Sequence, residues 1–151
     1  GEIQVKSAVK GIFHSEVNNS SSEDVQLLQI WVYPNEKGVK PRNDQKKTGT
    51  EEKKNSLIDI IRPKGSGDEE VIWIHQNAWF YLGDYTSNVE ENFKTKSLDN
   101  GIYIFVIEGE ISVDNHLLNK RDAVAIINAN EINLKIKKGS KVLLMEIPLK
   151  W

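Results

Sequence analysis

The stretch GIYIFVIEGEISVDN, residues 101–115, alternates apolar and polar side chains over much of its length. Alternation with a period of two places one set of side chains on each face of an extended strand. Asp99-Asn100-Gly101 leads into the stretch and Asp114-Asn115 ends it, and both are typical of tight turns. The pattern therefore predicts consecutive antiparallel hairpins with a core face and a polar face, formed by Tyr103, Phe105, Ile107, Ile111 and Val113 and by Glu108, Glu110, Ser112 and Asp114.

Further strand signals recur on both sides of this stretch. Residues 131–139 repeat the alternation, with Ile132, Leu134 and Ile136 predicted to face inward. Residues 140–148 are apolar on both faces, which indicates a strand covered on both sides. Helix-period segments are scarce, so the sequence predicts an all-β sandwich or barrel. Upstream, runs rich in β-branched and aromatic residues predict strands at residues 25–34, 55–63, 70–76 and 78–85.

The composition changes between residues 35 and 54. This segment is rich in Lys, Glu, Asn, Gly, Pro and Thr and has scarcely an apolar residue, so nothing in it could line a core. We interpret residues 35–54 as a polar linker or long loop. It separates a first β-rich block, residues 1–34, from a second, residues 55–151.

The composition of the whole chain restricts its classes of function. The chain has 151 residues, of which 38% are hydrophobic, and a formal net charge of -2. Such a chain can bury a real core, and it carries no basic field for direct nucleic-acid binding. No stretch approaches the roughly 20 apolar residues of a membrane span. The absence of cysteine excludes disulfides and thiolate metal sites, and it leads us to expect a cytoplasmic location.

The sequence GIFHSE, residues 11–16, places His14 and Glu16 two residues apart in a chain with only three histidines. On a strand, residues i and i+2 point the same way, so both side chains could converge on one ion. A catalytic divalent site generally needs three protein ligands. The pair alone is therefore either half of a metal site or two polar side chains at the surface.

The other chemistry-bearing residues favour structural roles. We expect His75 to pack at a core edge with a hydrogen bond to the backbone, and His116, after a hairpin turn, to be solvated. Glu108 and Glu110 are interpreted as outward-facing side chains, and no pattern predicts a catalytic residue. Four aromatic residues are more typical of a barrel core than of a pocket for a flat phenolic ligand: Trp73, Trp79, Phe80 and Tyr81.

Several segments, taken in order, resemble the pirin family, whose members are two cupin barrels in tandem. VKSAVKGIFHSEVN and LLQIWVYPNEKGVKPRNDQ, residues 5–18 and 27–45, are similar to the end of a pirin amino-terminal cupin. EKKNSLIDIIRPKGSGDEEVIWIHQNAWFYLG, residues 52–83, is similar to the start of the carboxy-terminal cupin in bacterial pirins and quercetinase-like proteins. The resemblance implies a cupin (double-stranded β-helix, or jelly-roll barrel) over residues 55–151. Residues 1–34 would be terminal strands of an incomplete amino-terminal cupin.

Residues 107–126 also resemble the general cupin hairpin, in which a glycine ends one strand and a Gly-Asp pair opens the next. Gly109 and Asp122 match this pattern, but Arg121 stands where the second glycine is usual. We therefore expect the turn to be built differently, or to be held without a positive φ at Arg121.

The resemblance gives the pair in GIFHSE a specific meaning. In the family, iron or a similar divalent metal is held in the amino-terminal cupin by an early His-x-His pair and a later His-x-Glu pair. His14 and Glu16 match the later pair, and no His-x-His occurs in this chain. Because the chain starts at Gly1 rather than Met, we expect either that upstream sequence supplies the missing ligands or that the metal site is half absent.

These observations lead to three functional hypotheses. The first is a pirin-like cupin module without catalysis, acting as a structural or protein-interaction domain. The second is metal-dependent quercetin 2,3-dioxygenase-like activity, if upstream sequence or another subunit supplies the missing ligands. The third is binding of a small molecule by aromatic residues of the barrel without chemistry.

The partner expectations follow from the same observations. Ile30, Trp31 and Val32 need a covering surface, which predicts packing of residues 2–34 on the carboxy-terminal barrel or self-association, with a homodimer as the expected form. The resemblance also implies a regulatory protein as a partner, because some pirins are linked to transcriptional regulators.

Overall fold

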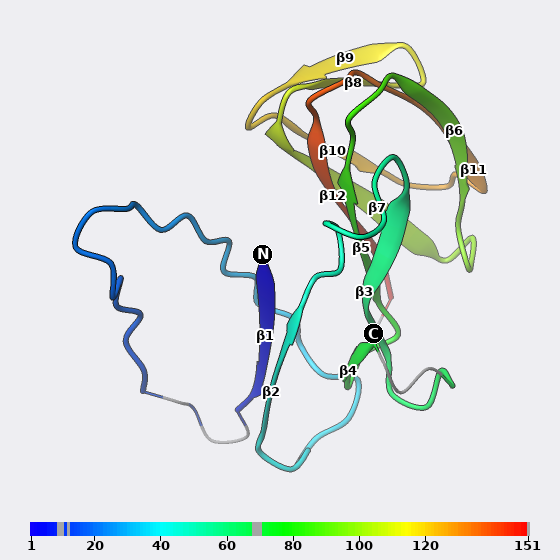
Figure 1. Ribbon diagram of the computed structural model, residues 1–151. Helices are drawn as coiled ribbons and strands as arrows, with labels where there is room; N and C mark the ends of the chain where they lie inside the picture. The colour runs from blue at the N-terminus through cyan, green and yellow to red at the C-terminus, as the bar shows by residue number, and fades with distance from the viewer. Residues whose placement is uncertain (9–10, 12, 68–70, 151) are drawn as a thin grey trace.

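The chain is built from short strands, turns and irregular segments (Figure 1). The structure, a computed structural model, describes residues 1–8, 11, 13–67 and 71–150, and this part of the chain contains no helix, so none that could span a membrane. The all-β prediction is confirmed. The strands are β1 (Glu2–Ser7), β2 (Arg42–Lys47), β3 (Leu57–Pro63), β4 (Ile72–Ile74), β5 (Trp79–Asp84), β6 (Val89–Lys94), β7 (Asn100–Glu108), β8 (Glu110–Val113), β9 (His116–Asn119), β10 (Ala123–Ile126), β11 (Glu131–Ile136) and β12 (Lys141–Pro148).

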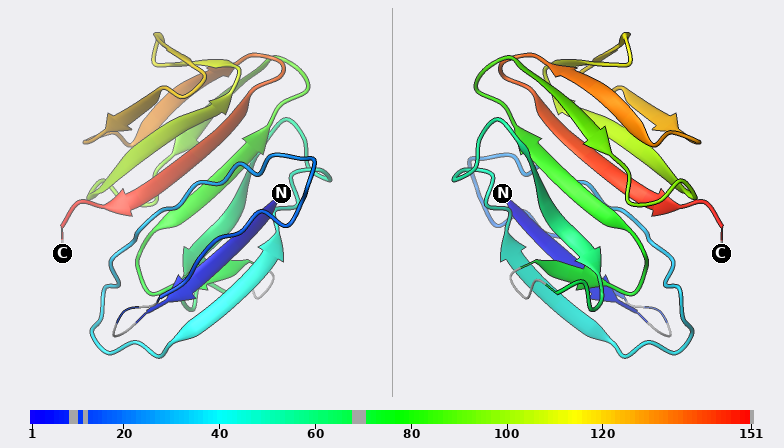
Figure 2. Two further views of the ribbon diagram at one scale, coloured as in Figure 1. Left: turned by 90° about the vertical axis from the view of Figure 1, so that its left-hand side faces the viewer. Right: turned by 90° about the vertical axis from the view of Figure 1, so that its right-hand side faces the viewer.

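The described strands form three sheets. A six-stranded sheet has the order β10-β7-β12-β5-β3-β4, a four-stranded sheet has the order β6-β11-β8-β9, and β1 and β2 form a two-stranded ribbon. The β3–β4 pair is parallel and the other pairs are antiparallel. The two larger sheets are the layers of one barrel, and the ribbon lies beside β4 of the six-stranded sheet (Figures 1 and 2).

β12 lies in the middle of the six-stranded sheet. It pairs with β5 on one side and with β7 on the other, so that Leu144 is opposite both Tyr81 and Ile104. Leu144 is fully buried between the sheets, and its neighbour Leu143 is 5% exposed within the outer cluster described below. The prediction of a strand covered on both sides is therefore confirmed.

Two apolar clusters hold the sheets together. On the outer face of the six-stranded sheet, Ile3 and Val5 of β1 pack against a buried cluster that includes Phe80 and Leu143. The main core lies between the two larger sheets, and it confirms the inward direction predicted for the alternating side chains of β11. Its aliphatic members are each at most 2% exposed: Ile102, Ile104, Val106, Ile111, Val113, Ile132, Leu134, Ile136, Val142 and Leu144.

The buried face of β7 is opposite to the predicted one. Ile104 and Val106 lie fully buried in the main core, whereas Tyr103, predicted to face inward, is 37% exposed. Phe105 and Ile107 of the predicted face are partly buried against the outer cluster instead. Gly109 explains the difference, because it adopts φ 80° between β7 and β8 and thereby interrupts the alternation of side chains. As a result, Val106 before the glycine and Ile111 after it lie in the same core.

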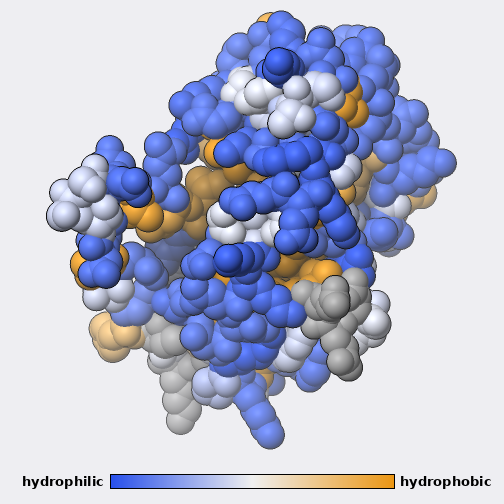
Figure 3. All heavy atoms as spheres, in the orientation of Figure 1, coloured by the Kyte–Doolittle hydropathy of each residue, from blue (hydrophilic) through white to orange (hydrophobic). Residues whose placement is uncertain are grey.

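Residues 25–34, predicted as a strand, form none. Their apolar side chains are exposed, from 38% at Val32 to 83% at Trp31, and apolar residues appear on the segment that stands apart from the sheets (Figure 3). A strand needs a neighbour to satisfy its backbone hydrogen bonds. No described strand pairs with this segment, and the prediction is wrong for that reason.

β2 lies inside residues 35–54, the segment interpreted as a linker or loop. Its side chains alternate between half-buried and exposed, and its backbone pairs with β1 from Arg42 opposite Ser7 to Lys47 opposite Glu2. Apolar residues are not required here, because backbone hydrogen bonds hold the ribbon together. The interpretation of this segment as free of strands is therefore wrong for residues 42–47.

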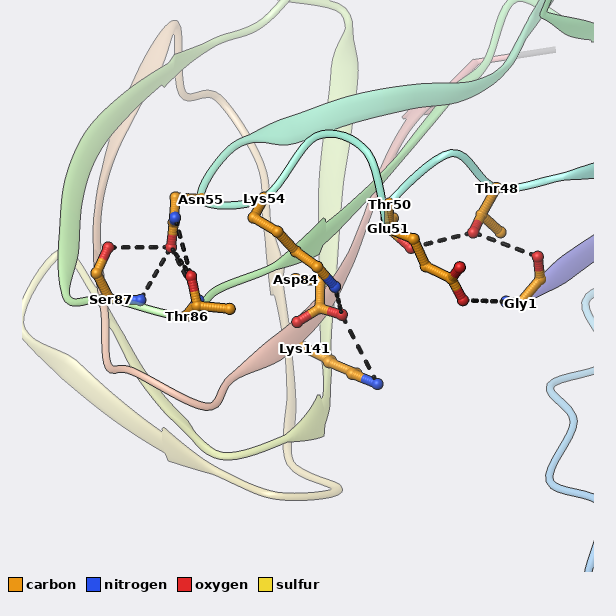
Figure 4. Close-up of polar contacts among 10 residues, drawn as sticks. All are labelled: Gly1, Thr48, Thr50, Glu51, Lys54, Asn55, Asp84, Thr86, Ser87 and Lys141. Carbon is orange, nitrogen blue, oxygen red and sulfur yellow. Dashed lines mark hydrogen bonds and ion pairs between the residues drawn. The ribbon is translucent and has the colours of Figure 1, made fainter.

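Residues 35–54, called the connector from here on, lead into β3, and the residues at their end bond to the turn after β5 (Figure 4). Asn55 adopts φ 62°, and its Oδ1 accepts hydrogen bonds from the backbone N–H groups of Thr86 and Ser87 at 2.8 and 2.9 Å. Lys54 Nζ lies 2.7 Å from Asp84 Oδ2. These contacts determine where β3 enters the barrel.

Two turns in the β8–β10 region contain residues with positive φ. Asp114 and Asn115 have φ 45° and 68°, as expected for a type I′ hairpin between β8 and β9. Arg121 adopts φ 73°, so the second of the two expected alternatives, a turn without a positive φ, is wrong. The Arg121 N–H donates to Val106 O at 2.7 Å, and the Val106 N–H donates to Asp122 O at 3.0 Å. Arg121 and Asp122 thus lie together opposite Val106. This two-to-one pairing is a β-bulge whose first residue, Arg121, has a left-handed backbone conformation.

Replacement of Arg121 by glycine is expected to raise the free energy of unfolding by roughly 0.5–1 kcal/mol, because relief of left-handed strain exceeds the entropic cost of glycine. Urea unfolding followed by tryptophan fluorescence measures the change. Gly109→Ala is the control, and it should destabilise the protein because its Cβ would lie 2.4 Å from Ser140 Oγ. Unchanged or lower stability of Arg121→Gly would contradict the assigned backbone conformation.

Candidate functional site

His14 and Glu16 lie in the irregular segment between β1 and β2, not on a strand. His14 Nε2 is nevertheless 3.5 Å from Glu16 Oε1, so the two side chains do come together. Lys6 Nζ lies 3.3 Å from the same carboxylate oxygen. All three side chains are partly exposed, and together they form a polar cluster at the surface.

This cluster by itself does not meet the requirements of a divalent metal. Such sites generally take three or more protein ligands, whereas His14 and Glu16 supply two and Lys6 competes for the carboxylate. Across residues 1–8, 11, 13–67 and 71–150, no group of three or more histidine, aspartate or glutamate side chains is placed to hold a metal ion. A site for iron or another divalent metal would therefore need further ligands.

A second polar group surrounds the end of β4, where the connector meets the barrel. The Asn35 N–H donates to His75 O at 2.7 Å, and Gln76 Nε2 donates to Tyr33 O at 2.9 Å. His75 Nδ1 lies 2.6 Å from Glu36 Oε1. A polar hollow of about 230 Å³ is bordered by four of these residues, Asn35, Glu36, His75 and Gln76. Their contacts fix residues 35–54, the connector, to the barrel at this point.

His75 and Trp73 pack together beside this hollow. The two rings meet edge to face at a centroid distance of 5.0 Å, and the His75 side chain is 9% exposed, which confirms the predicted packing. The partner of His75 is a carboxylate, however, and not the backbone. The Arg42 guanidinium lies 3.8 Å from the centroid of the Trp73 ring. No pattern in the sequence singles out Arg42, because nothing local reveals which strand residues 35–54 approach.

The aromatic residues considered as a pocket are mostly part of the core. Phe80 and Tyr81 are buried, and Trp79 packs against the main core. Tyr81 meets Phe93 edge to face at a centroid distance of 5.0 Å. This close packing agrees with the core interpretation of these residues.

Three oxygen atoms of the six-stranded sheet are buried without a hydrogen-bond partner among the described residues: Asp59 Oδ1, Tyr81 Oη and Glu146 Oε2. Asp59 is directly opposite Tyr81 in the register of β3 and β5. The other oxygen of the Glu146 carboxylate accepts a hydrogen bond from Asn100 Nδ2 at 2.6 Å. Burial raises the pKa of Tyr81, and the negative charges of Asp59 and Glu146 add to the effect. The phenol is thereby held in its neutral form.

Tyr85 is the contrasting case of a buried tyrosine with a partner. Its hydroxyl donates to Glu91 Oε1 at 2.5 Å, and burial followed by this hydrogen bond raises its pKa. The ring lies against Gly83, where a Cβ would come within 2.4 Å of it. Gly83 is therefore required by the packing of Tyr85.

The remaining polar residues singled out in the sequence lie at the surface. His116 is exposed, as predicted. Glu108 Oε1 lies 2.8 Å from Lys120 Nζ, and this hydrogen bond lowers the pKa of Glu108. Glu110 pairs with Lys137. These contacts are surface ion pairs, in agreement with the outward direction expected for both glutamates.

Comparison with known proteins identifies the barrel. The family model described as the quercetinase C-terminal cupin domain matches residues 63–147, more than half of the chain. The chain belongs to the pirin family. The matched region runs from the end of β3 into β12, so it covers most of the barrel described above.

Individual relatives agree with this assignment. The chain is similar to a quercetin 2,3-dioxygenase of Escherichia coli strain K12, with 29% identity over 148 residues that cover 98% of this chain and 62% of the relative. It thus spans about three-fifths of the length of the curated relatives it matches. Among solved structures it resembles YhhW from Escherichia coli, with a TM-score of 0.69 and 19% identity over 78% of this chain and 48% of YhhW. A structure of YhhW described as a bacterial pirin in complex with nickel(II) has a TM-score of 0.68, with the same identity and coverage.

The two buried tyrosines predict opposite effects of removing a hydroxyl. Tyr81→Phe should raise the free energy of unfolding by about 1 kcal/mol, because it removes a buried group without a partner. Tyr85→Phe should lower it by about 1–2 kcal/mol, because it breaks a hydrogen bond to a carboxylate. Chemical unfolding of both variants near neutral pH tests the pair. Changes of the same sign would contradict the hydrogen-bond assignment.

Proposed function

We propose that this chain acts as a non-catalytic structural and protein-interaction module of a two-cupin protein. In this proposal residues 55–150 form the carboxy-terminal cupin. Residues 11–34 belong to an amino-terminal cupin whose other strands come from upstream sequence. The greater length of the curated relatives is in keeping with such a division, since this chain matches 62% of the Escherichia coli K12 relative.

The packing of the barrel interior carries the proposal. A binding site inside a barrel needs open space with a few convergent polar groups. The inner positions of β7, β8, β11 and β12 instead carry aliphatic side chains in mutual contact, and Ile104, Leu134 and Leu144 have no exposed surface. An interior of this kind stabilises the fold and leaves the outer surface for interactions.

The exposed apolar segment supports an interaction role. Rows of exposed apolar side chains mark surfaces that other protein covers. The end of the segment is held to the barrel because Tyr33 and Asn35 bond to Gln76 and His75, which directly follow β4, so that it occupies a defined position. The residues concerned are Val25, Leu27, Leu28, Ile30, Trp31, Val32 and Tyr33.

A metal-dependent quercetin 2,3-dioxygenase activity is the second candidate. It is favoured by the approach of His14 to Glu16 and by the name of the Escherichia coli relative. In this case the two residues would be part of the ligand set for iron or another divalent metal, which would supply binding of the flavonol and of dioxygen. Further ligands would come from upstream sequence or from another subunit.

Metal content distinguishes the structural proposal from a dioxygenase whose further ligands come from another copy of this chain. The chain is mixed with Fe(II), Mn(II), Ni(II) or Zn(II), dialysed, and analysed by elemental mass spectrometry. The structural proposal predicts that the unaltered chain and His14→Ala retain equally little metal. His116→Ala is the matched control, because it removes an exposed histidine far from Glu16 in the sequence. Near-stoichiometric metal that His14→Ala loses and His116→Ala keeps would overturn the proposal in favour of the dioxygenase.

A further inference from the structure

β10 forms one end of the six-stranded sheet and has a free edge. It pairs with β7, with Ala123 opposite Phe105 and Ile126 opposite Ile102, and with no other described strand (Figure 1). The strand and the residue after it read Ala-Val-Ala-Ile-Ile and carry no charge. Ala123, Ala125 and Ile127 are exposed. An uncharged, exposed edge of this kind is a template for pairing with another strand.

The register shows which backbone groups face outward. Hydrogen-bonded positions recur at every second residue of an antiparallel pair. Because Val106 bonds to Asp122, the residues Val124 and Ile126 direct their N–H and C=O groups to β7. Ala123 and Ala125 therefore direct theirs to the free edge. Within the described part of the chain, no hydrogen bond reaches the outward groups of these two alanines.

Other sheet edges of the protein are protected. At β4, Arg42 Nη1 donates to Trp73 O at 2.7 Å. At β9, Asp122 Oδ2 accepts from the Asn119 N–H at 2.8 Å. At β6, exposed charged side chains such as Glu90 and Lys94 line the edge, and charges of this kind discourage pairing. β10 has neither a capping side chain nor an exposed charge within the strand.

We propose that β10 pairs antiparallel with β10 of a second copy of this chain, joining two six-stranded sheets across a two-fold axis. Ala125 of one copy faces Ala125 of the other, and Ala123 of each faces Ile127 of the other. This register brings outward N–H and C=O groups opposite one another. It makes the interface self-complementary, as two-fold symmetry requires.

The sequence around β10 favours a second copy of this chain as the partner of the free edge. The alanine side chains are small and allow close approach of the two copies. In this register the charged residues Lys120, Arg121 and Asp122 of one copy lie opposite residues 128–130 of the other, which are uncharged, so no like charges oppose the pairing. The inference does not depend on the proposed function, because it uses only the backbone edge of β10. Gln26 approaches this region through its side chain, whose Oε1 accepts from Arg121 Nη2 at 3.4 Å, two residues before the strand.

Disulfide crosslinking tests the register directly, since the chain has no cysteine of its own. Facing residues of a hydrogen-bonded antiparallel pair have Cα atoms about 5.5 Å apart, which a disulfide can span. Ala125→Cys should therefore form a covalent dimer under mild oxidation. Lys94→Cys, at the exposed edge strand β6, is the control and should crosslink at least tenfold more slowly. Equal rates would overturn the proposed register.

Blocking the edge tests the association itself. Light scattering should show a dimer for the unaltered chain and a monomer for Ala125→Lys and Ala125→Pro. The proline removes an outward N–H and spares the bonds to β7, while the lysine keeps the backbone intact should the proline fail to fold. A monomer for the unaltered chain at all concentrations would overturn the proposal and leave the edge to a strand of another protein. A dimer that persists in folded Ala125→Lys would overturn it as well.

Discussion

The apolar contact between the two facing sheets is the constraint on which the rest of the structure depends. β7 and β12 lie side by side in the six-stranded sheet and present Ile104, Val106 and Leu144 to the aliphatic side chains of β8 and β11. Each fully buried side chain of this size contributes roughly 1.5–3 kcal/mol. The strands at the ends of the sheet, the ribbon and the connector are placed by their contacts with this core, directly or through neighbours.

Much of this core could be predicted from the sequence, because the responsible patterns are local. The alternation in β11 and the two apolar faces of β12 identify strands without knowledge of their neighbours. Which face of β7 enters the main core could not be predicted in the same way. Gly109 resets the alternation by adopting a positive φ. Ser140, distant in the sequence, lies so close that a Cβ at position 109 would clash with it.

The other errors also come from pairing between distant segments. Residues 25–34 have the composition of a strand but pair with no described strand, whereas β2 has the composition of a loop and pairs with β1. For the candidate site, the resemblance identified the family. His14 and Glu16 do approach each other, but in an irregular segment and not on the strand from which the expectation was drawn. The contacts of Glu36 with His75 and of Arg42 with Trp73 could not be anticipated, because they join the connector to the barrel.

Amide hydrogen exchange by mass spectrometry is the most direct test of the claim that the two-sheet core sustains the fold while residues 25–33 lie outside it. Strongly buried strands exchange only through global opening, whereas uncovered backbone exchanges at once. The account predicts slow exchange for peptides from β7, β11 and β12 and near-complete exchange within seconds for residues 25–33. Protection of residues 25–33 comparable to that of β12 would contradict the account, because it would show that this segment is part of the folded core.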